Sequence, residues 1–122
     1  MELIVILFTL LVVKHFIADF ILQTDKMVHE KGTYGAPGGL HHSLWHGLLT
    51  AFIFFPVIGS AMLALKIGFI DALCHYHIDW AKMNITRKYT PANKEFWFWL
   101  GVDQMLHYLT YIGLIAWIFA FV

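Results

Sequence analysis

The stretch Phe69-Ile-Asp-Ala-Leu-Cys-His-Tyr-His-Ile-Asp-Trp-Ala-Lys82 decides the fold, because it ends an apolar run and yet carries regularly spaced ionisable groups. Asp71, His75 and Asp79 recur in it at intervals of four. In an α-helix this spacing stacks the three side chains on one face, each about 40° round from the last. Ionisable groups in an apolar helix are costly and usually functional. The stretch therefore predicts a helix with one polar, functional face.

Three other segments repeat the same spacing of histidine or aspartate. They are His15 with Asp19, His42 with His46, and Asp103 with His107. Each pair places two potential metal ligands on one face of a helix. The sequence therefore predicts four helices that each contribute such a pair.

The composition is typical of a membrane protein. Hydrophobic residues make up 60% of the chain and charged residues 13%, whereas a soluble domain has about 45–50% and about 25%. Membrane lipids are the expected partners. The formal net charge of zero gives no indication of a nucleic-acid partner. The single cysteine, Cys74, excludes an intrachain disulfide and any zinc site of the CxxC type.

Four helices are expected in a single domain, residues 1–122. Their predicted ranges are about 2–24, 40–58, 61–82 and 91–121, and each is long enough to cross a bilayer. Residues 25–39, which are polar and rich in glycine, and residues 83–90 are expected to be loops. Thr90 and Pro91 resemble an N-cap followed by proline at the first helical position. The predicted fold is all-α: a polytopic membrane protein built as a four-transmembrane-helix antiparallel bundle.

The basic residues predict the orientation of this bundle. Lys26 and Lys31 lie in the first loop, and Lys82, Arg87, Lys88 and Lys94 lie in or beside the second. The turn at 56–61 and the C-terminus have none. By the positive-inside rule both charged loops are cytoplasmic and both termini lie outside the cytoplasm. Lys14 and Lys66, within predicted spans, are expected to snorkel or to find a carboxylate.

The predicted helix ends also place the polar residues at similar depths. At 1.5 Å per residue, one layer lies roughly 9–14 Å below the cytoplasmic ends and contains His15, His46, His75 and Asp103. A shallower layer contains Asp19, His42 and Asp79, and Asp71 and His107 lie deeper. Because successive helices alternate in direction, these coinciding depths predict one shared site.

Energetics require the aspartates to face inward. A central aspartate facing lipid costs roughly 2.5–3.5 kcal/mol, so four would cost on the order of 10 kcal/mol. Two divalent cations would neutralise four carboxylates and leave the histidines uncharged, as metal ligation requires. Histidine with carboxylate suits zinc, manganese or iron better than calcium or magnesium. We therefore expect one or two divalent ions, with zinc as the first choice.

Roles can be assigned to the candidate site residues. The candidate metal ligands are His15, Asp19, His42, His46, His75, Asp79 and His107. Asp71 and Asp103 are candidate catalytic bases that could instead be ligands or orient them. The residues at the cytoplasmic mouth are Gln23, Lys26, Lys31, Lys82 and Gln104, which would bind an anionic substrate or, for the lysines, anchor helices at headgroups. His41 and His77 fall on other helix faces: His41 is expected at the membrane interface, and His77 is expected to point elsewhere.

Several of these motifs occur in one order that resembles a known family. The motifs are His15-Phe-Ile-Ala-Asp-Phe-Ile-Leu-Gln23, then Lys26 and Lys31, His75-Tyr-His-Ile-Asp-Trp-Ala-Lys82, and Asp103-Gln-Met-Leu-His107. They resemble a bacterial and phage membrane-protein family, domain of unknown function 3307, over residues 15–107. The resemblance implies a multi-pass protein of the bacterial inner (plasma) membrane and names no reaction. The HxxxD pairs are more loosely similar to those of membrane-bound metal-dependent hydrolases.

Three functions fit these residues. The first is a metal-dependent hydrolase acting on a membrane-associated substrate, for which a phosphoester would suit two metal ions about 4 Å apart. The second is a homo-oligomeric component for proton or divalent-cation transport. The third is a structural or regulatory protein whose polar layer only fixes helix packing. Residues 3–13 and 113–122 have almost no polar side chains, which favours a pocket open only to the cytoplasm.

Overall fold

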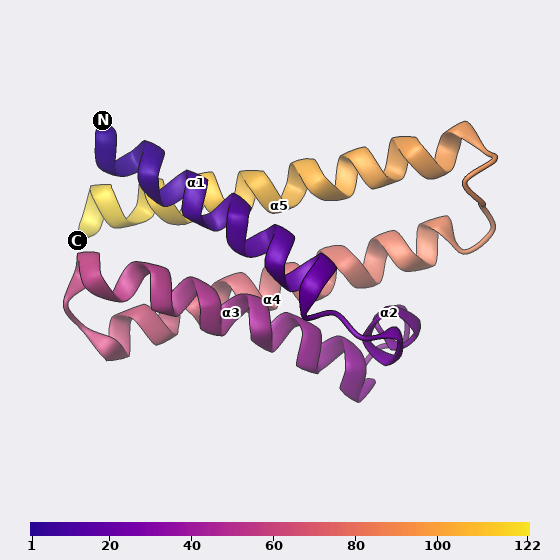
Figure 1. Ribbon diagram of the computed structural model, residues 1–122, viewed down its shortest axis with the longest axis horizontal. Helices are drawn as coiled ribbons and strands as arrows, with labels where there is room; N and C mark the ends of the chain where they lie inside the picture. Colours follow the sequence, from indigo (N-terminus) through magenta and orange to yellow (C-terminus); the bar gives the residue numbers. More distant parts are fainter.

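Four long helices run alternately in opposite directions along the molecule (Figure 1). The computed structural model describes residues 1–122. Its elements are α1 (Glu2–Phe16), continued by a π-helical turn η1 (Ile17–Ile21), then α2 (Asp25–Glu30), α3 (Pro37–Ile58), α4 (Ala61–Thr86) and α5 (Lys94–Phe121). Both termini and the α3–α4 turn lie at one end, and α2 and the α4–α5 turn lie at the other. The all-α prediction is confirmed.

The helix boundaries differ from the expected ranges for local reasons. Residues 25–39 are not all loop, because the Thr24 side chain accepts a hydrogen bond from the Met27 amide at 3.4 Å and starts α2. The predicted N-cap at Thr90 is wrong. The Asn93 side chain accepts hydrogen bonds from the amide and hydroxyl of Thr90, and this turn keeps Pro91 outside the helix. Asn93 is therefore the N-cap, and α5 begins at Lys94.

Three helical segments are long and apolar enough to cross a membrane: Glu2–Ile21, Ala61–Thr86 and Lys94–Phe121. Large apolar side chains cover the outer surface, as shown by Phe20, Phe52 and Phe69, which are 75%, 77% and 67% exposed. Many charged and polar side chains are buried between the helices instead. This distribution is the reverse of that in a soluble protein and suits a lipid environment.

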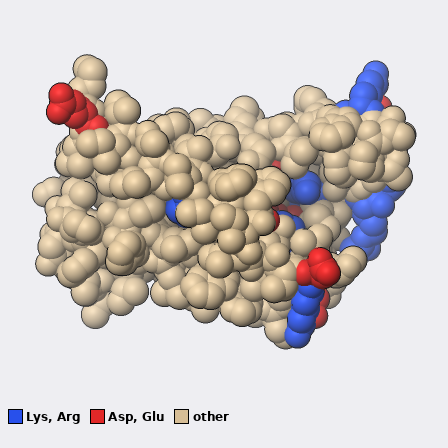
Figure 2. Space-filling model, viewed as in Figure 1, with Lys and Arg blue, Asp and Glu red and all other residues tan.

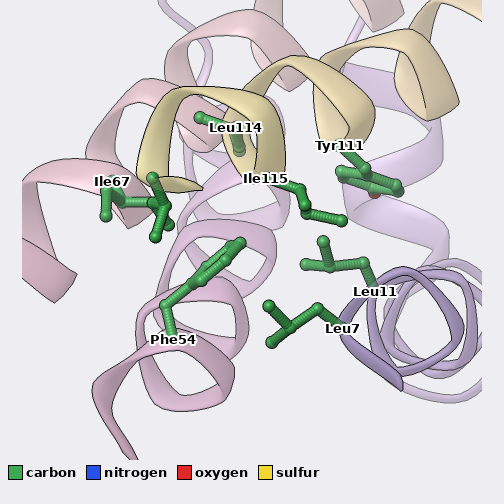
Figure 3. Packing of buried hydrophobic residues seen from close by; sticks show 8 residues of the cluster. Leu7, Leu11, Phe54, Ile67, Tyr111, Leu114 and Ile115 are labelled. Atoms are coloured by element: carbon green, nitrogen blue, oxygen red, sulfur yellow. The ribbon is translucent and has the colours of Figure 1, made fainter. Parts of the chain in front are cut away.

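Apolar side chains fill the bundle toward the termini. The buried cluster consists of Leu7, Leu11, Phe54, Ile67, Tyr111, Leu114, Ile115 and Ile118, seven of which are labelled in Figure 3. They come from α1, α3, α4 and α5 and point toward one another (Figure 3). This half of the bundle contains a dry core.

Helices α3 and α4 form the closest pair in the bundle. Their backbones touch at Gly47 and Gly68, where a Cβ added to Gly47 would lie 2.6 Å from the Gly68 carbonyl oxygen. Small residues allow such close approach between membrane helices. The crossing holds the histidine face of α3 against the Asp71–Asp79 face of α4.

Candidate metal centre

Five buried histidines from four helical elements meet in the loop-side half of the bundle. They are His15, His42, His46, His75 and His107, each 2% exposed or less. The rings of His46 and His75 stack with centroids 3.5 Å apart, and those of His75 and His107 with centroids 4.1 Å apart. The structure therefore brings all the predicted ligand histidines into one cluster.

Asp19 joins three of these rings. Its Oδ1 lies 3.0 Å from His46 Nε2 and 3.2 Å from His42 Nε2, and its Oδ2 lies 3.1 Å from His15 Nε2. His75 Nε2 lies 3.2 Å from His42 Nε2. With metal–ligand bonds of about 2.0–2.1 Å, the edges of a zinc tetrahedron measure about 3.4 Å. Asp19, His42, His46 and His75 thus form a group of donor atoms close to the dimensions of a tetrahedral site.

The π-helical turn η1 carries Asp19. The Leu22 amide donates to the Ile17 carbonyl at 3.0 Å, so the helix widens by one residue at this point. Single π-turns inside α-helices often occur at functional sites. Here the widened turn holds the carboxylate of Asp19 between α1 and α3.

Asp79 joins the first group to a second one. Its Oδ2 lies 3.4 Å from the Nε2 atoms of His42 and His75, and its Oδ1 lies 3.3 Å from His107 Nε2. Asp103 Oδ1 lies 3.5 Å from His107 Nε2. Asp79, Asp103 and His107 form a second possible ligand group, and His15, His75 and His107 form a third. The groups share residues, so the arrangement could hold two neighbouring ions with Asp79 between them.

Several buried polar atoms in this cluster have no hydrogen-bond partner. Among them are His15 Nε2 and Asp103 Oδ1. His15 Nε2 is only 3.1 Å from an Asp19 oxygen, but the two atoms are not aligned for a hydrogen bond. An unsatisfied buried polar group costs about 1–3 kcal/mol. A cation accepting these lone pairs would remove that cost, so the residues fit a divalent metal ion.

Asp71 lies outside the three ligand groups. Its Oδ2 accepts hydrogen bonds of 2.6 Å from both Lys14 Nζ and the Thr50 hydroxyl. Lys14 and Asp71 are 3% and 1% exposed. The expectation that Lys14 would find a carboxylate is confirmed, whereas Lys66 is exposed. Asp71 therefore neutralises Lys14 and makes no contact with a candidate ligand group.

Lys14 also contacts His46, with Nζ 3.3 Å from both Nδ1 and the carbonyl oxygen. An ammonium beside Nδ1 favours the tautomer with its proton on Nε2, which then donates to Asp19. Binding of a metal through Nε2 requires the other tautomer. When a metal binds through Nε2, the Lys14 ammonium would therefore donate its hydrogen bonds only to Asp71 and to the carbonyl oxygen of His46.

Lys31 closes the loop-side mouth of the cluster. Its Nζ lies 3.0 Å from Asp79 Oδ2 and donates to Gln23 Oε1 at 2.9 Å. The Gln23 amide nitrogen donates to the Asp19 carbonyl at 3.0 Å. The Gln104 amide nitrogen lies 3.0 Å from Asp103 Oδ2. Of the predicted mouth residues, these three contact the cluster.

Lys26 and Lys82 are placed differently. Lys26 is exposed and lies 4.0 Å from Glu30. Lys82 lines a hollow next to Met83 and Arg87, and its nearest polar contact is the Met83 sulfur at 3.9 Å. Neither ammonium touches a candidate ligand.

Glycines and a tyrosine hold Lys31 in position. The Gly38 amide donates to Glu30 at 2.6 Å, and a Cβ added to Gly39 would lie 3.1 Å from the Lys31 Cα. The Gly35 amide donates to the Tyr76 hydroxyl at 2.6 Å. The short α2 therefore packs against the start of α3 and is fastened to α4, which directs Lys31 toward Asp79.

Two supporting residues had no role in the sequence interpretation. Thr50 and Tyr111 extend the His42–His46 and Asp103–His107 series by one further step of four. The Tyr111 hydroxyl lies 2.7 Å from His15 Nδ1, and Thr50 holds Asp71. Extending each i, i+4 series would have found both residues. The contact of Lys14 with His46 has no comparable signal in the sequence.

Other polar residues lie where the helix faces predicted. His41 is exposed and stacks on Trp45 at 6.1 Å between centroids. His77 is exposed and lies 3.1 Å from the Tyr34 hydroxyl. Cys74 is half-buried and belongs to no ligand group. The cluster therefore contains the residues that share the i, i+4 faces and leaves out the polar residues on other faces.

Residues 7–122 match the sequence pattern of a protein family that is described as protein of unknown function (DUF3307). The chain belongs to this family. No curated protein and no solved structure matches the chain. The predicted resemblance to DUF3307 is confirmed over nearly the whole chain, and the looser likeness to membrane-bound hydrolases stays a prediction. The function of this DUF3307 chain has to be argued from its buried cluster.

Proposed function

We propose that the chain is a four-span protein of the bacterial inner membrane that binds one or two divalent metal ions and hydrolyses a membrane-associated substrate. The observation that carries this proposal is the convergence of three histidine nitrogens and an aspartate oxygen in a buried layer, with separations of 3.0–3.2 Å between neighbours. Such a layer is expensive in a membrane unless a cation occupies it.

Helix α3 completes the bundle as a fourth span. Its 22 residues reach about 33 Å, enough for a bilayer core. Its outer face is apolar: Leu44, Leu48 and Phe52 are 52%, 45% and 77% exposed. Its polar residues other than His41 are buried against the other helices. Most of the polar side chains that lower the hydropathy of α3 would therefore not meet lipid.

The charge distribution supports the predicted orientation. Basic groups gather at the end that carries α2 and the α4–α5 turn (Figure 2). Both termini lie at the opposite end. By the positive-inside rule, the basic end faces the cytoplasm and the metal centre opens toward it.

The chemistry of the ligands favours zinc, with manganese or iron as alternatives. A bound divalent ion would polarise a water molecule and the ester that it attacks. Asp103 is our assigned general base, because its Oδ1 is buried and unpartnered beside His107, whereas both available contacts of Asp71 are to Lys14 and Thr50. Lys31 would release Asp79 and contact an anionic substrate at the mouth. A phosphoester carries the negative charge that would attract the Lys31 ammonium.

Transport is less well supported. Beyond Lys14 and Asp71, the apolar cluster around Leu11, Phe54 and Ile67 fills the bundle and leaves no polar path to the termini (Figure 3). A purely structural role would not require a buried oxygen without a hydrogen-bond partner, such as Asp103 Oδ1. A buried polar layer that is closed toward the termini fits a hydrolase better than a conduction path.

Elemental analysis of detergent-purified protein tests the proposal. Wild type should carry about one to two equivalents of zinc, manganese or iron. His46→Ala and Asp79→Ala should each lose at least one, because even the loss of a residue that only hydrogen-bonds to a metal ligand costs about 10–100-fold in affinity. His41→Ala is the matched control and should retain the metal. A wild type that stays free of metal after incubation with each ion would rule the proposal out.

The reaction is tested separately with phosphodiester and phosphomonoester lipids. Asp103→Asn should keep its metal and lose hydrolysis, and a chelator should abolish activity that added metal restores. Loss of metal from Asp103→Asn would make Asp103 a ligand rather than the base. Full metal loading with no hydrolysis of any membrane ester would contradict the enzymatic role.

A further inference from the structure

The α4–α5 corner contains two hollows that the metal centre does not use. The first, of about 360 Å³, is lined by Lys82 and Arg87 together with Gly32 and Thr33 of the α2–α3 linker. The second, of about 610 Å³, is lined by Arg87, Lys88 and Trp99, among others. Arg87 and Tyr89 line both. The two hollows therefore flank one basic turn.

No carboxylate lines either hollow. The Arg87 guanidinium donates one hydrogen bond, to Asn84 Oδ1 at 3.0 Å, and most of its N–H groups are therefore free. Lys82 is half-buried and has no ion pair. Glu30 on α2 lines neither hollow and accepts a hydrogen bond from the Gly38 amide. Two cations thus share a cavity without a counter-charge.

Hydrogen bonds fix the residues around the α4–α5 corner. The Asn84 side chain donates to the Gly32 carbonyl at 2.9 Å and to the Trp80 carbonyl at 2.8 Å, which ties the linker to α4. Thr86 is buried, and its hydroxyl donates to the Lys82 carbonyl at 2.8 Å. Trp97 is exposed and bonded to the Pro91 carbonyl at 2.8 Å, as expected for an aromatic at a membrane interface.

We infer that the Lys82–Arg87 corner is a binding site for a phosphate group at the cytoplasmic membrane surface. Arginine provides forked donors for phosphate oxygens, lysine adds a point charge, and Tyr89 and Trp99 supply flat walls for the glycerol or acyl part of a lipid. The source is either an anionic lipid headgroup or free phosphate. The site stands independently of the metal centre, because none of the three ligand groups includes a residue of either hollow.

The test is calorimetric titration of the full chain in a neutral maltoside detergent, with and without a chelator. The probes are short-chain phosphatidic acid, short-chain phosphatidylcholine and inorganic phosphate. We expect phosphatidic acid to bind equally well with the chelator and on the order of tenfold more tightly than phosphatidylcholine. Inorganic phosphate binding as tightly as phosphatidic acid would identify free phosphate as the ligand, and much weaker binding would identify the headgroup.

The variants separate a site from general charge. Arg87→Gln and Lys82→Gln should each weaken phosphatidic acid on the order of tenfold. Lys94→Gln, which removes a basic residue of the same end that lines neither hollow, should change it less than about twofold. Unchanged binding by both corner variants would overturn the inference, as would an equal loss in Lys94→Gln. Arg87 is exposed, so its variant should fold even if Lys82→Gln does not.

Discussion

The two halves of the bundle use the same four helices for different purposes. Toward the termini, Leu7, Phe54, Ile67 and Ile115 pack into an apolar core that any well-shaped aliphatic set could replace. Toward the charged loops, the same helices bury histidines and aspartates whose oxygens and nitrogens lie 3.0–3.5 Å apart. In a lipid environment apolar packing is sufficient for helix association.

The apolar packing that stabilises the bundle and the candidate metal centre are therefore separated along the helix axis. The apolar half can hold the helices together without the polar half, which is costly and has unpaired atoms. Lys14 and Asp71 lie between the two and neutralise each other. Changes within the apolar core should therefore leave metal binding intact, whereas changes at contacts that join the two halves should affect both stability and metal binding. Four substitutions test this.

Lys14→Met should have the largest effect on the free energy of unfolding, a loss of about 3–5 kcal/mol, because it leaves the buried Asp71 carboxylate unpaired. The double variant Lys14→Met/Asp71→Leu should recover most of that loss. Denaturant unfolding in micelles, followed by tryptophan fluorescence, measures both. If the double variant is no more stable than the single one, the ion pair is not the reason for the destabilisation.

Phe54→Ala should lower the free energy of unfolding by about 3 kcal/mol by leaving a cavity in the apolar half. Its metal content should equal that of wild type. Phe52→Ala is the matched control, since Phe52 is 77% exposed and Phe54 fully buried. Loss of metal from Phe54→Ala would show that the two halves are coupled.

Gly68→Ala should cost about 1–3 kcal/mol, because the added methyl group meets the Gly47 carbonyl and pushes α3 away from α4. The same shift should weaken metal binding, because the ligands of α3 and α4 would move apart. Gly113→Ala, where nothing lies within 4 Å of the added carbon, is the control for stability and metal affinity. Equal effects of the two variants would contradict the proposed helix contact.

Tyr111→Phe should have the smallest effect, a loss of about 1 kcal/mol of stability, because only the hydroxyl bonded to His15 is removed. Metal affinity should fall by about tenfold, since such outer contacts orient histidine ligands. Chelator competition measures this loss. Tyr108→Phe should leave the affinity unchanged, because Tyr108 packs against His15 without a hydrogen bond.

Much of the site could be predicted from local periodicity. The i, i+4 pairs correctly indicated that His15, His46, His75 and His107 share inward faces, while His41 and His77 point outward. Side-chain direction on a helix follows from 3.6 residues per turn, which the sequence alone specifies. Helix α2 and the start of α5 were missed, because the Thr24 side chain caps α2 and the Asn93 side chain bonds back to Thr90.

By itself the sequence determined four amphipathic long helices, the polar residues on each inward face, and the end that carries the basic loops. The tertiary structure decided which atoms meet: Asp19 between His15, His42 and His46, Asp79 between two histidine groups and Lys31, and Asp71 with Lys14 rather than with the cluster. The reason is physical. Helical periodicity fixes directions within one helix, whereas the rotation and separation of neighbouring helices depend on contacts such as Gly47 with Gly68, which join residues far apart in the chain.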